Sequence, residues 1–271
     1  MGNATLSRYL GFLNTPPLWV KNQFGLEQFS FPELDLDSLE TEDIPRGIRL
    51  GHQMEFVFKQ CILQSKKYEL LVYNVPIREG GKTLGEIDFI LKDRLRKQYF
   101  HVELTFKFYI VNPEISEPIH RLMGPNRRDM FFTKLDKIQK EQLSLLNTSQ
   151  GKELLETYKL DTVEILPRVC FKAQLFNPYG TEKVHIRPLN KACVAGYWIR
   201  FDAFKSQEFS TGLYYIPFKH EWPVKPNNDV IWMSYYEVLL EVNIRMIKEQ
   251  TPMLWRKKSD TEFEKFFVVW W

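Results

Sequence analysis

The sequence predicts an α/β (α+β) fold in which a mixed central sheet is flanked by helices. Two hydrophobic patterns alternate along the chain: apolar residues three or four apart, typical of amphipathic helices, and apolar runs or alternations typical of strands. They follow the order helix, three strands, helix and then further strands. This order is typical of a sheet with helices packed against it.

The first 46 residues are expected to form an N-terminal arm. They are rich in proline, acidic and aromatic residues, and the stretch LDLDSLETEDIP predicts an acidic linker or loop. A helix is expected from about 47 to 65, because Leu50, Met54, Val57 and Cys61 recur at helical spacing. Glu55 lies on the shoulder of this apolar stripe.

Three strands are expected next, at 68–77, 84–92 and 98–111. The short polar turns REGGKT and KDRLRK join them, which predicts an antiparallel meander. The letters GGKT also resemble the end of a phosphate-binding loop, but that motif needs a glycine where Pro76 stands and a helix where a strand follows. We therefore interpret GGKT as part of a hairpin turn.

A second helix is expected from about 127 to 146. Its apolar stripe includes Leu135 and Ile138 and is interrupted by Gln142, a polar residue at a position expected to face the core. Further strand-like segments lie at 168–176, 194–201 and 212–218, followed by a helix at about 232–249 and the apolar run FEKFFVVWW.

Composition and cysteine usage favour a cytoplasmic protein without a membrane span. The formal net charge of +3 permits nucleic-acid binding but does not argue for it. Three cysteines occur without a C-x-x-C pair, which favours a reducing compartment over a disulfide framework. No run of about 18 apolar residues predicts a membrane helix, and the five scattered histidines lack the spacing of a zinc hydrolase.

Two carboxylates on neighbouring strands form the strongest candidate site. Asp88 interrupts the apolar run IDFIL, where a buried charge is costly unless it is paired, hydrogen-bonded or bound to a metal. In HVELTFKF (101–108) the side chains alternate, so Glu103 lies on the polar face. Counting outward from the turn near 94–96 makes Asp88 and Glu103 close neighbours, about 5 Å apart if directly opposite.

Two carboxylates at this spacing repel each other unless a cation lies between them. Oxygen ligands on adjacent strands suit Mg²⁺ or Mn²⁺. A lysine on the same face could orient a water or stabilise charge that develops on a phosphate. The alternative is that the carboxylates form structural ion pairs with Lys107, Arg94 or Arg96.

A strand bearing Asp, a hairpin, and a strand bearing Glu and Lys, with a helix before and after, resemble the PD-(D/E)XK nuclease superfamily. A closer resemblance is to an uncharacterised bacterial family, a domain of unknown function that has been grouped with that superfamily. The segments that carry the resemblance are GIRLGHQMEFVF (47–58), LGEIDFILKD (84–93), HVELTFKFY (101–109), RLMGPNRRDMFFTKLDKIQKEQL (121–143) and VAGYWIRF (194–201).

The resemblance implies a restriction-endonuclease-like core at about 47–201, inside a domain of 47–271 whose C-terminal extension is 202–271. Asp88 and Glu103 match the metal-binding acidic residues, and Lys107 matches the catalytic lysine. Glu55 matches an acidic residue that many members carry on the first helix, and it is expected to join Asp88 and Glu103 as a metal ligand. Gln142 matches a glutamine near the site in some branches. The implied cofactor is Mg²⁺ or Mn²⁺, and the implied substrate is nucleic acid, with DNA favoured.

One position departs from the superfamily pattern. The lysine normally follows the glutamate by two residues, where this chain has Thr105, and Lys107 is four residues away, roughly 13 Å along a strand. A long side chain or a bulge could return the ammonium to the site. Three alternatives therefore remain: an active nuclease, a nuclease-like fold that binds nucleic acid or a protein partner without catalysis, and a structural domain with ion-paired carboxylates.

Overall fold

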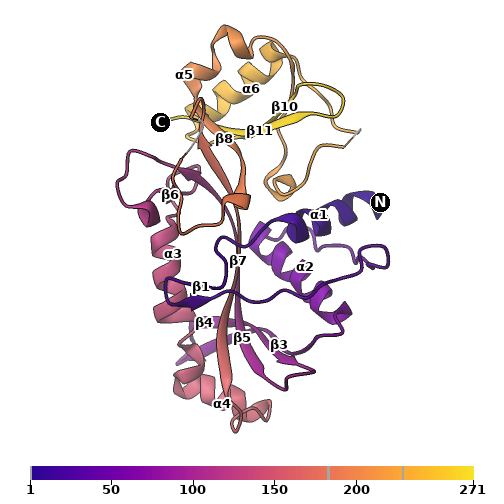
Figure 1. Ribbon diagram of the computed structural model, residues 1–271, viewed down its shortest axis with the longest axis vertical. Coiled ribbons are helices and arrows are strands. Elements are labelled where there is room, and N and C mark those ends of the chain that lie inside the picture. The colour runs from indigo at the N-terminus through magenta and orange to yellow at the C-terminus, as the bar shows by residue number, and fades with distance from the viewer. Residues whose placement is uncertain (1, 182–183, 228) are drawn as a thin grey trace. The chain divides into compact units, whose positions relative to one another are not determined.

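The computed structural model describes residues 2–181, 184–227 and 229–271 (Figure 1). Within them the helices are α1 (Gly2–Asn14), α2 (Leu50–Gln64), α3 (Phe131–Lys137), α4 (Ser149–Thr157), α5 (Phe201–Phe204) and α6 (Tyr235–Ile247). The strands are β1 (Asn22–Gln23), β2 (Leu26–Glu27), β3 (Tyr68–Glu79), β4 (Lys82–Asp93), β5 (Tyr99–Val111), β6 (Leu122–Met123), β7 (Ile165–Pro178), β8 (Val194–Arg200), β9 (Leu213–Tyr215), β10 (Met253–Lys257) and β11 (Phe263–Val269).

The main sheet has the strand order β3–β4–β5–β7–β8–β11–β10–β9, with β6 paired to β5. Strands β3 to β5 form the expected antiparallel meander, and β9, β10 and β11 are also antiparallel neighbours. Strand β8 runs parallel to both β7 and β11. The predicted fold class, a mixed sheet flanked by helices, is therefore confirmed.

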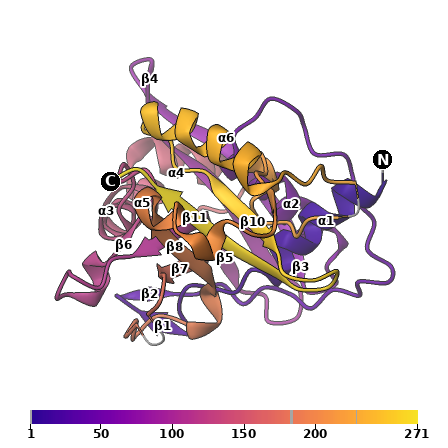
Figure 2. The same ribbon diagram turned by 90° about the horizontal axis from the view of Figure 1, so that it is seen from above.

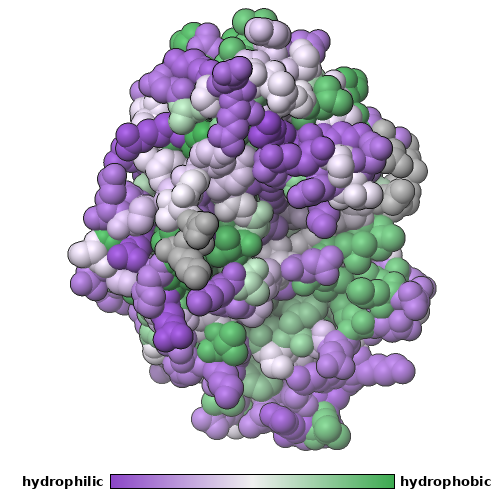
Figure 3. All heavy atoms as spheres, turned by 45° about the horizontal axis from the view of Figure 1, so that its top comes forward, coloured by the Kyte–Doolittle hydropathy of each residue, from purple (hydrophilic) through white to green (hydrophobic). Residues whose placement is uncertain are grey.

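The chain divides into two compact units. Unit 1 comprises residues 1–9, 17–106 and 133–172, and unit 2 comprises residues 10–16, 107–132 and 173–271. None of the helices in the described part of the chain is long and apolar enough to cross a membrane. On the face drawn in Figure 3, hydrophilic side chains are interspersed with groups of apolar ones.

In unit 1, helical segments cover both faces of the meander. The ring of Phe89 on β4 lies 4.5 Å from that of Phe58 on α2. The next residue, Ile90, packs in a cluster with Leu145 and Leu146 from the segment between α3 and α4. Because successive side chains of a strand point to opposite faces, Asp88 shares the face of Ile90 and is turned away from α2.

The second predicted helix is shorter and less regular than its apolar stripe suggests. Arg127 has a positive φ of 59°, which is left-handed backbone that an α-helix does not contain, so α3 begins only at Phe131. A π-helical turn, Ile138–Gln142, follows α3 directly. In this turn the Leu143 N–H donates to the carbonyl of Ile138, five residues earlier, at 2.9 Å.

The segment expected to be an N-terminal arm is more structured than its composition indicates. Helix α1 occupies its start, and Tyr9, Phe12, Leu18 and Trp19 are fully buried. The proline and acidic residues of this segment are concentrated at 32–45, whereas these apolar anchors lie in α1 or shortly after it. Burial of large aromatic side chains is a strong driving force for local order.

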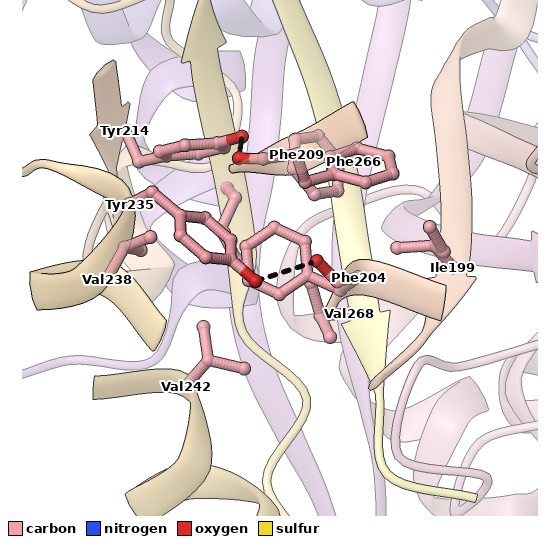
Figure 4. Close-up of a cluster of buried hydrophobic side chains, with 10 residues drawn as sticks. Ile199, Phe204, Phe209, Tyr214, Tyr235, Val238, Val242, Phe266 and Val268 are labelled. Atoms are coloured by element: carbon pink, nitrogen blue, oxygen red, sulfur yellow. Dashed lines mark hydrogen bonds between the residues drawn. The ribbon is translucent and has the colours of Figure 1, made fainter. Parts of the chain in front are cut away.

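Unit 2 has its own aromatic core, which Figure 4 shows in close-up. Val238 and Val242 of α6 pack with Phe266 and Val268 of β11. The Tyr214 hydroxyl donates to the carbonyl of Phe209 at 2.7 Å, so its polar end is satisfied inside the cluster. Figure 2 shows α6 alongside β10 and β11, the strands that this core joins to it.

Candidate functional site

The antiparallel register of β4 and β5 brings the two predicted carboxylates together. Ile90 lies opposite His101 and Phe89 opposite Val102, so one further step in the same register places Asp88 opposite Glu103. The ladder between the strands ends there, and Asp88 Oδ2 accepts a hydrogen bond from the Leu104 N–H at 2.9 Å. Both side chains are buried, with 8% of Asp88 and 1% of Glu103 exposed.

A chain of hydrogen bonds holds Glu103. His101 Nε2 lies 3.1 Å from Glu103 Oε1, and Gln142 Nε2 donates to Glu103 Oε2 at 2.6 Å. The other end of Gln142 accepts from Lys134 Nζ at 2.7 Å. Gln142 thus lies beside Glu103, where the resemblance implied a glutamine, and contacts it from the helical segment that packs on this face of the sheet.

The π-helical turn explains how Lys134 and Gln142 reach the same place. In a regular α-helix, residues eight apart are offset by about 80° around the axis, at 3.6 residues per turn. The wider turn at Ile138–Gln142 rotates the chain less per residue. Gln142 therefore lies nearly in line with Lys134, and the two side chains bond to each other.

Burial controls the ionisation of this cluster. It raises the pKa of Glu103 to about 7, although the charge of Lys134 opposes the rise. Burial, and then the negative charge of Glu103, raise the pKa of Asp88 well above its usual range. Burial lowers the pKa of His101 to about 4, so the imidazole is neutral at neutral pH. Near neutrality the two carboxyls therefore retain a proton between them, which a cation could replace.

Lys134 belongs to this cluster but was not among the residues predicted from the sequence. Its positive charge lowers the pKa of both Asp88 and Glu103, so it is the cation that faces the pair. In the sequence it is one of six basic residues in 121–140 and has no distinguishing neighbour. Its spacing from Gln142 gave no signal either, because eight residues of a regular helix do not bring two side chains into line.

Lys107 and Thr105 occupy different environments. Lys107 belongs to unit 2, and its Nζ lies 2.6 Å from Asp129 Oδ2 in the same unit. Thr105, at the position of the superfamily lysine, is buried, and its hydroxyl has no hydrogen-bond partner. Arg94, a candidate for a structural ion pair, instead lies 3.7 Å from Glu69.

Glu55 contributes charge from α2. Its Oε2 lies 2.9 Å from His52 Nδ1 and accepts from Asn74 Nδ2 at 3.2 Å. Burial is the main cause of the raised pKa of Asp88 and Glu103, and the charge of Glu55 adds to it. Among the residues that the structure describes, no group of three or more His, Cys, Asp or Glu is arranged to hold a metal ion.

Comparison with known families places these residues in one domain. A family described as "Domain of unknown function (DUF1853)" matches residues 25–269. The chain belongs to this family. No curated protein and no solved structure matches it. The DUF1853 domain includes every candidate site residue, from Glu55 to Gln142.

The basic segment 121–140 of the DUF1853 domain is partly engaged in structural contacts. Arg121 donates to the carbonyls of Ile115 and Ser116, and Lys140 pairs with Asp136 at 2.6 Å. Arg127, Arg128 and Lys137 are exposed. The positive charge available to a polyanion is therefore smaller than the residue count indicates.

Proposed function

We propose that this protein is a metal-dependent nuclease that hydrolyses phosphodiester bonds in nucleic acid, with DNA as its substrate. The proposal includes membership of the DUF1853 domain in the PD-(D/E)XK superfamily. The observation that carries it is the buried pair of opposed carboxylates, Asp88 and Glu103, with the ammonium of Lys134 facing them. Asp and Glu on adjacent antiparallel strands are the arrangement that the sequence resemblance implies.

The donor set fits Mg²⁺ or Mn²⁺. Both cations prefer hard oxygen ligands, and Mg²⁺ is often held by only one or two carboxylates, with water and substrate phosphate completing its coordination. Asp88 and Glu103 supply two such carboxylates, so a third protein ligand is not required. The orphaned hydroxyl of buried Thr105 supports the same conclusion, because a buried polar atom without a partner is rare unless it serves a water or an ion.

Each side chain of the cluster has a distinct role in the proposed reaction. The bound cation supplies Lewis-acid activation of the phosphate and lowers the pKa of a bound water. Gln142 and His101 fix the orientation of Glu103 through hydrogen bonds to its two oxygens. Lys134 is placed to stabilise negative charge on the phosphate, the role that the resemblance assigned to Lys107. The proton that the carboxyls retain would leave when Asp88 and Glu103 hold the cation.

DNA cleavage tests the proposal directly. Single- and double-stranded DNA are incubated with Mg²⁺ or Mn²⁺ and the wild type, Asp88→Asn, Glu103→Gln, Lys134→Met or Lys107→Met. We expect Asp88→Asn and Glu103→Gln to abolish cleavage, and Lys134→Met to reduce it more than Lys107→Met. Glu69→Gln is the matched control, because Glu69 is a half-exposed carboxylate on β3 that bonds none of the site residues. Cleavage that persists in both carboxylate variants would contradict the mechanism.

A second candidate is a catalytically inactive nuclease-like domain that binds nucleic acid or a protein partner. It is favoured by the 1% exposure of Glu103, whose two oxygens are already bonded to His101 and Gln142. This candidate predicts DNA affinity that is unchanged by a chelator and by Asp88→Asn. The nuclease predicts affinity that increases when Mg²⁺ is added to the wild type and does not increase for Asp88→Asn.

A further inference from the structure

Helix α6 is apolar on two sides. Tyr235, Val238 and Val242 face the core of unit 2 (Figure 4). On another side, four large apolar residues are exposed: Tyr236 (76%), Leu240 (68%), Ile244 (47%) and Ile247 (76%). Their spacing of four, four and three places them in one stripe along the helix. A surface helix normally presents polar residues to water, and a contiguous apolar stripe of this kind marks an interaction site.

The stripe and its flanking charges are self-complementary. When two copies of α6 cross antiparallel, Tyr236 of one lies across from Ile247 of the other, and Leu240 lies across from Ile244, because the four residues are symmetric about the helix centre. Glu237 and Lys248 lie on the same flank of the stripe, at about 100° per residue, near opposite ends of the helix. The antiparallel arrangement therefore brings Glu237 of each copy to Lys248 of the other. In a parallel two-fold pair these flanks lie on opposite sides of the contact, and the two charges do not meet.

We propose that α6 forms a two-fold symmetric, antiparallel homodimer interface. A two-fold interface uses the same patch on both subunits, which is the property that this stripe has. Helix α6 has 13 residues and is about 20 Å long. A single helix pair of this length buries less area than a permanent dimer requires, so the dimer forms transiently and depends on concentration.

Sedimentation velocity from low micromolar to several hundred micromolar protein tests the interface. The wild type is expected to shift from monomer to dimer with increasing concentration, and Leu240→Glu at the middle of the stripe is expected to raise the dissociation constant at least about tenfold. Leu95→Glu is the matched control, because Leu95 is 89% exposed in the β4–β5 turn. Circular dichroism establishes that both variants fold. A monomer at all concentrations, or a dimer that Leu240→Glu leaves unchanged, overturns the proposal.

Cross-linking tests the orientation. The native cysteines Cys61, Cys170 and Cys193 are buried, so introduced cysteines at the surface react selectively. Oxidation of a mixture of Tyr236→Cys and Ile247→Cys is expected to yield more cross-linked dimer than oxidation of either variant alone. Cross-linking that is equal in all three samples, or strongest within one variant, overturns the antiparallel arrangement.

Discussion

At the residue scale, Glu103 is a buried carboxyl whose ionisation opposes folding. Its pKa rises from 4.5 to about 7, mainly through burial. Between these two values the folded state binds more protons than the unfolded state, so the contribution of Glu103 to stability falls as the pH rises. Perturbed pKa values of this kind are common at functional sites, which supports the proposed cation site.

Replacement of Glu103 by glutamine should therefore stabilise the metal-free protein above pH 7. At pH 8 the expected gain in the free energy of unfolding is as much as about 3 kcal/mol, because each unit of pKa shift corresponds to about 1.4 kcal/mol. The gain should shrink towards pH 5, where the folded wild type already holds the proton. Urea denaturation of the wild type and Glu103→Gln at several pH values measures this difference.

The contribution of His101 to stability depends on pH in the opposite direction, so the two contributions have to be measured separately. Its pKa is lowered from 6.5 to about 4, so stability is lost as the pH falls through that window. His101 is present in both Glu103→Gln and the wild type. Its contribution therefore cancels when the free energies of unfolding of the two proteins are subtracted at each pH. A stability difference that is independent of pH would show that Glu103 ionises normally.

Lys134 should control the ionisation of the pair. Because its charge lowers the pKa of both Asp88 and Glu103, Lys134→Met is expected to move the Glu103 titration above about 7. Lys134→Arg should keep it near the wild-type value. Carboxyl ¹³C resonances followed by NMR against pH report the shift, and an unmoved Glu103 midpoint in Lys134→Met would exclude this role.

The sequence alone locates the two carboxylates, Asp88 and Glu103, but not the lysine that faces them, Lys134. Asp88 and Glu103 follow from strand alternation and a count from the turn, because the period of a strand is fixed. Gln142 follows from a polar residue in an apolar stripe. Lys134 could not be chosen, because its contact with Gln142 depends on a π-helical turn, and no residue type encodes such a turn.

At the element scale, helix α4 packs closely on the segment that supports Gln142. A Cβ added at Gly151, near the start of α4, would clash with the backbone of Leu145 and Leu146. Leu145 and Leu146 are buried in one hydrophobic cluster with Ile90 of β4. The packing of α4 therefore helps to fix the segment between α3 and α4 against the sheet face that carries Asp88.

Two glycine substitutions separate packing from helix propensity. Gly151→Ala should destabilise the protein by about 1–3 kcal/mol, because backbone atoms cannot move aside cheaply. Gly51→Ala in α2 should stabilise it by about 0.5–1 kcal/mol, because a Cβ there meets nothing within 4 Å and alanine favours the helix. Thermal unfolding of both variants provides the measurement, and equal effects of one sign would contradict the packing at Gly151.

Hydrophobic periodicity located most elements to within a few residues, but the helix expected at 127–146 was too long and several elements, among them α1 and β10, were missed. Helix α2, the meander, β7, β8, β11 and α6 all lie where their patterns place them. Helix α1 was missed because it was grouped with the proline-rich and acidic stretch that follows it. Strand β10 was missed because it is a short segment, MLWRK, whose burial depends on its partner strands. Such elements are stabilised by distant contacts, which local patterns do not contain.

At the scale of the whole molecule, the carboxylate pair and its bonded partners lie within unit 1. The site combines two segments of unit 1: 17–106, which holds Asp88 and Glu103, and 133–172, which holds Lys134 and Gln142. Between them, residues 107–132 belong to unit 2. The site therefore exists only when unit 1 is assembled. A ligand of the site should accordingly report on the folding of unit 1 as a whole.

Mg²⁺ or Mn²⁺ should stabilise the protein in proportion to site occupancy. At a concentration about 100 times the dissociation constant, the expected gain is about 2.7 kcal/mol. The gain should be larger at pH 8 than at pH 6, because below about 7 the cation must displace the proton of Glu103. Differential scanning calorimetry with and without the cation measures it. Asp88→Asn and Glu103→Gln should lose the gain while Glu69→Gln keeps it, and an equal gain in all four proteins would assign the cation to another site.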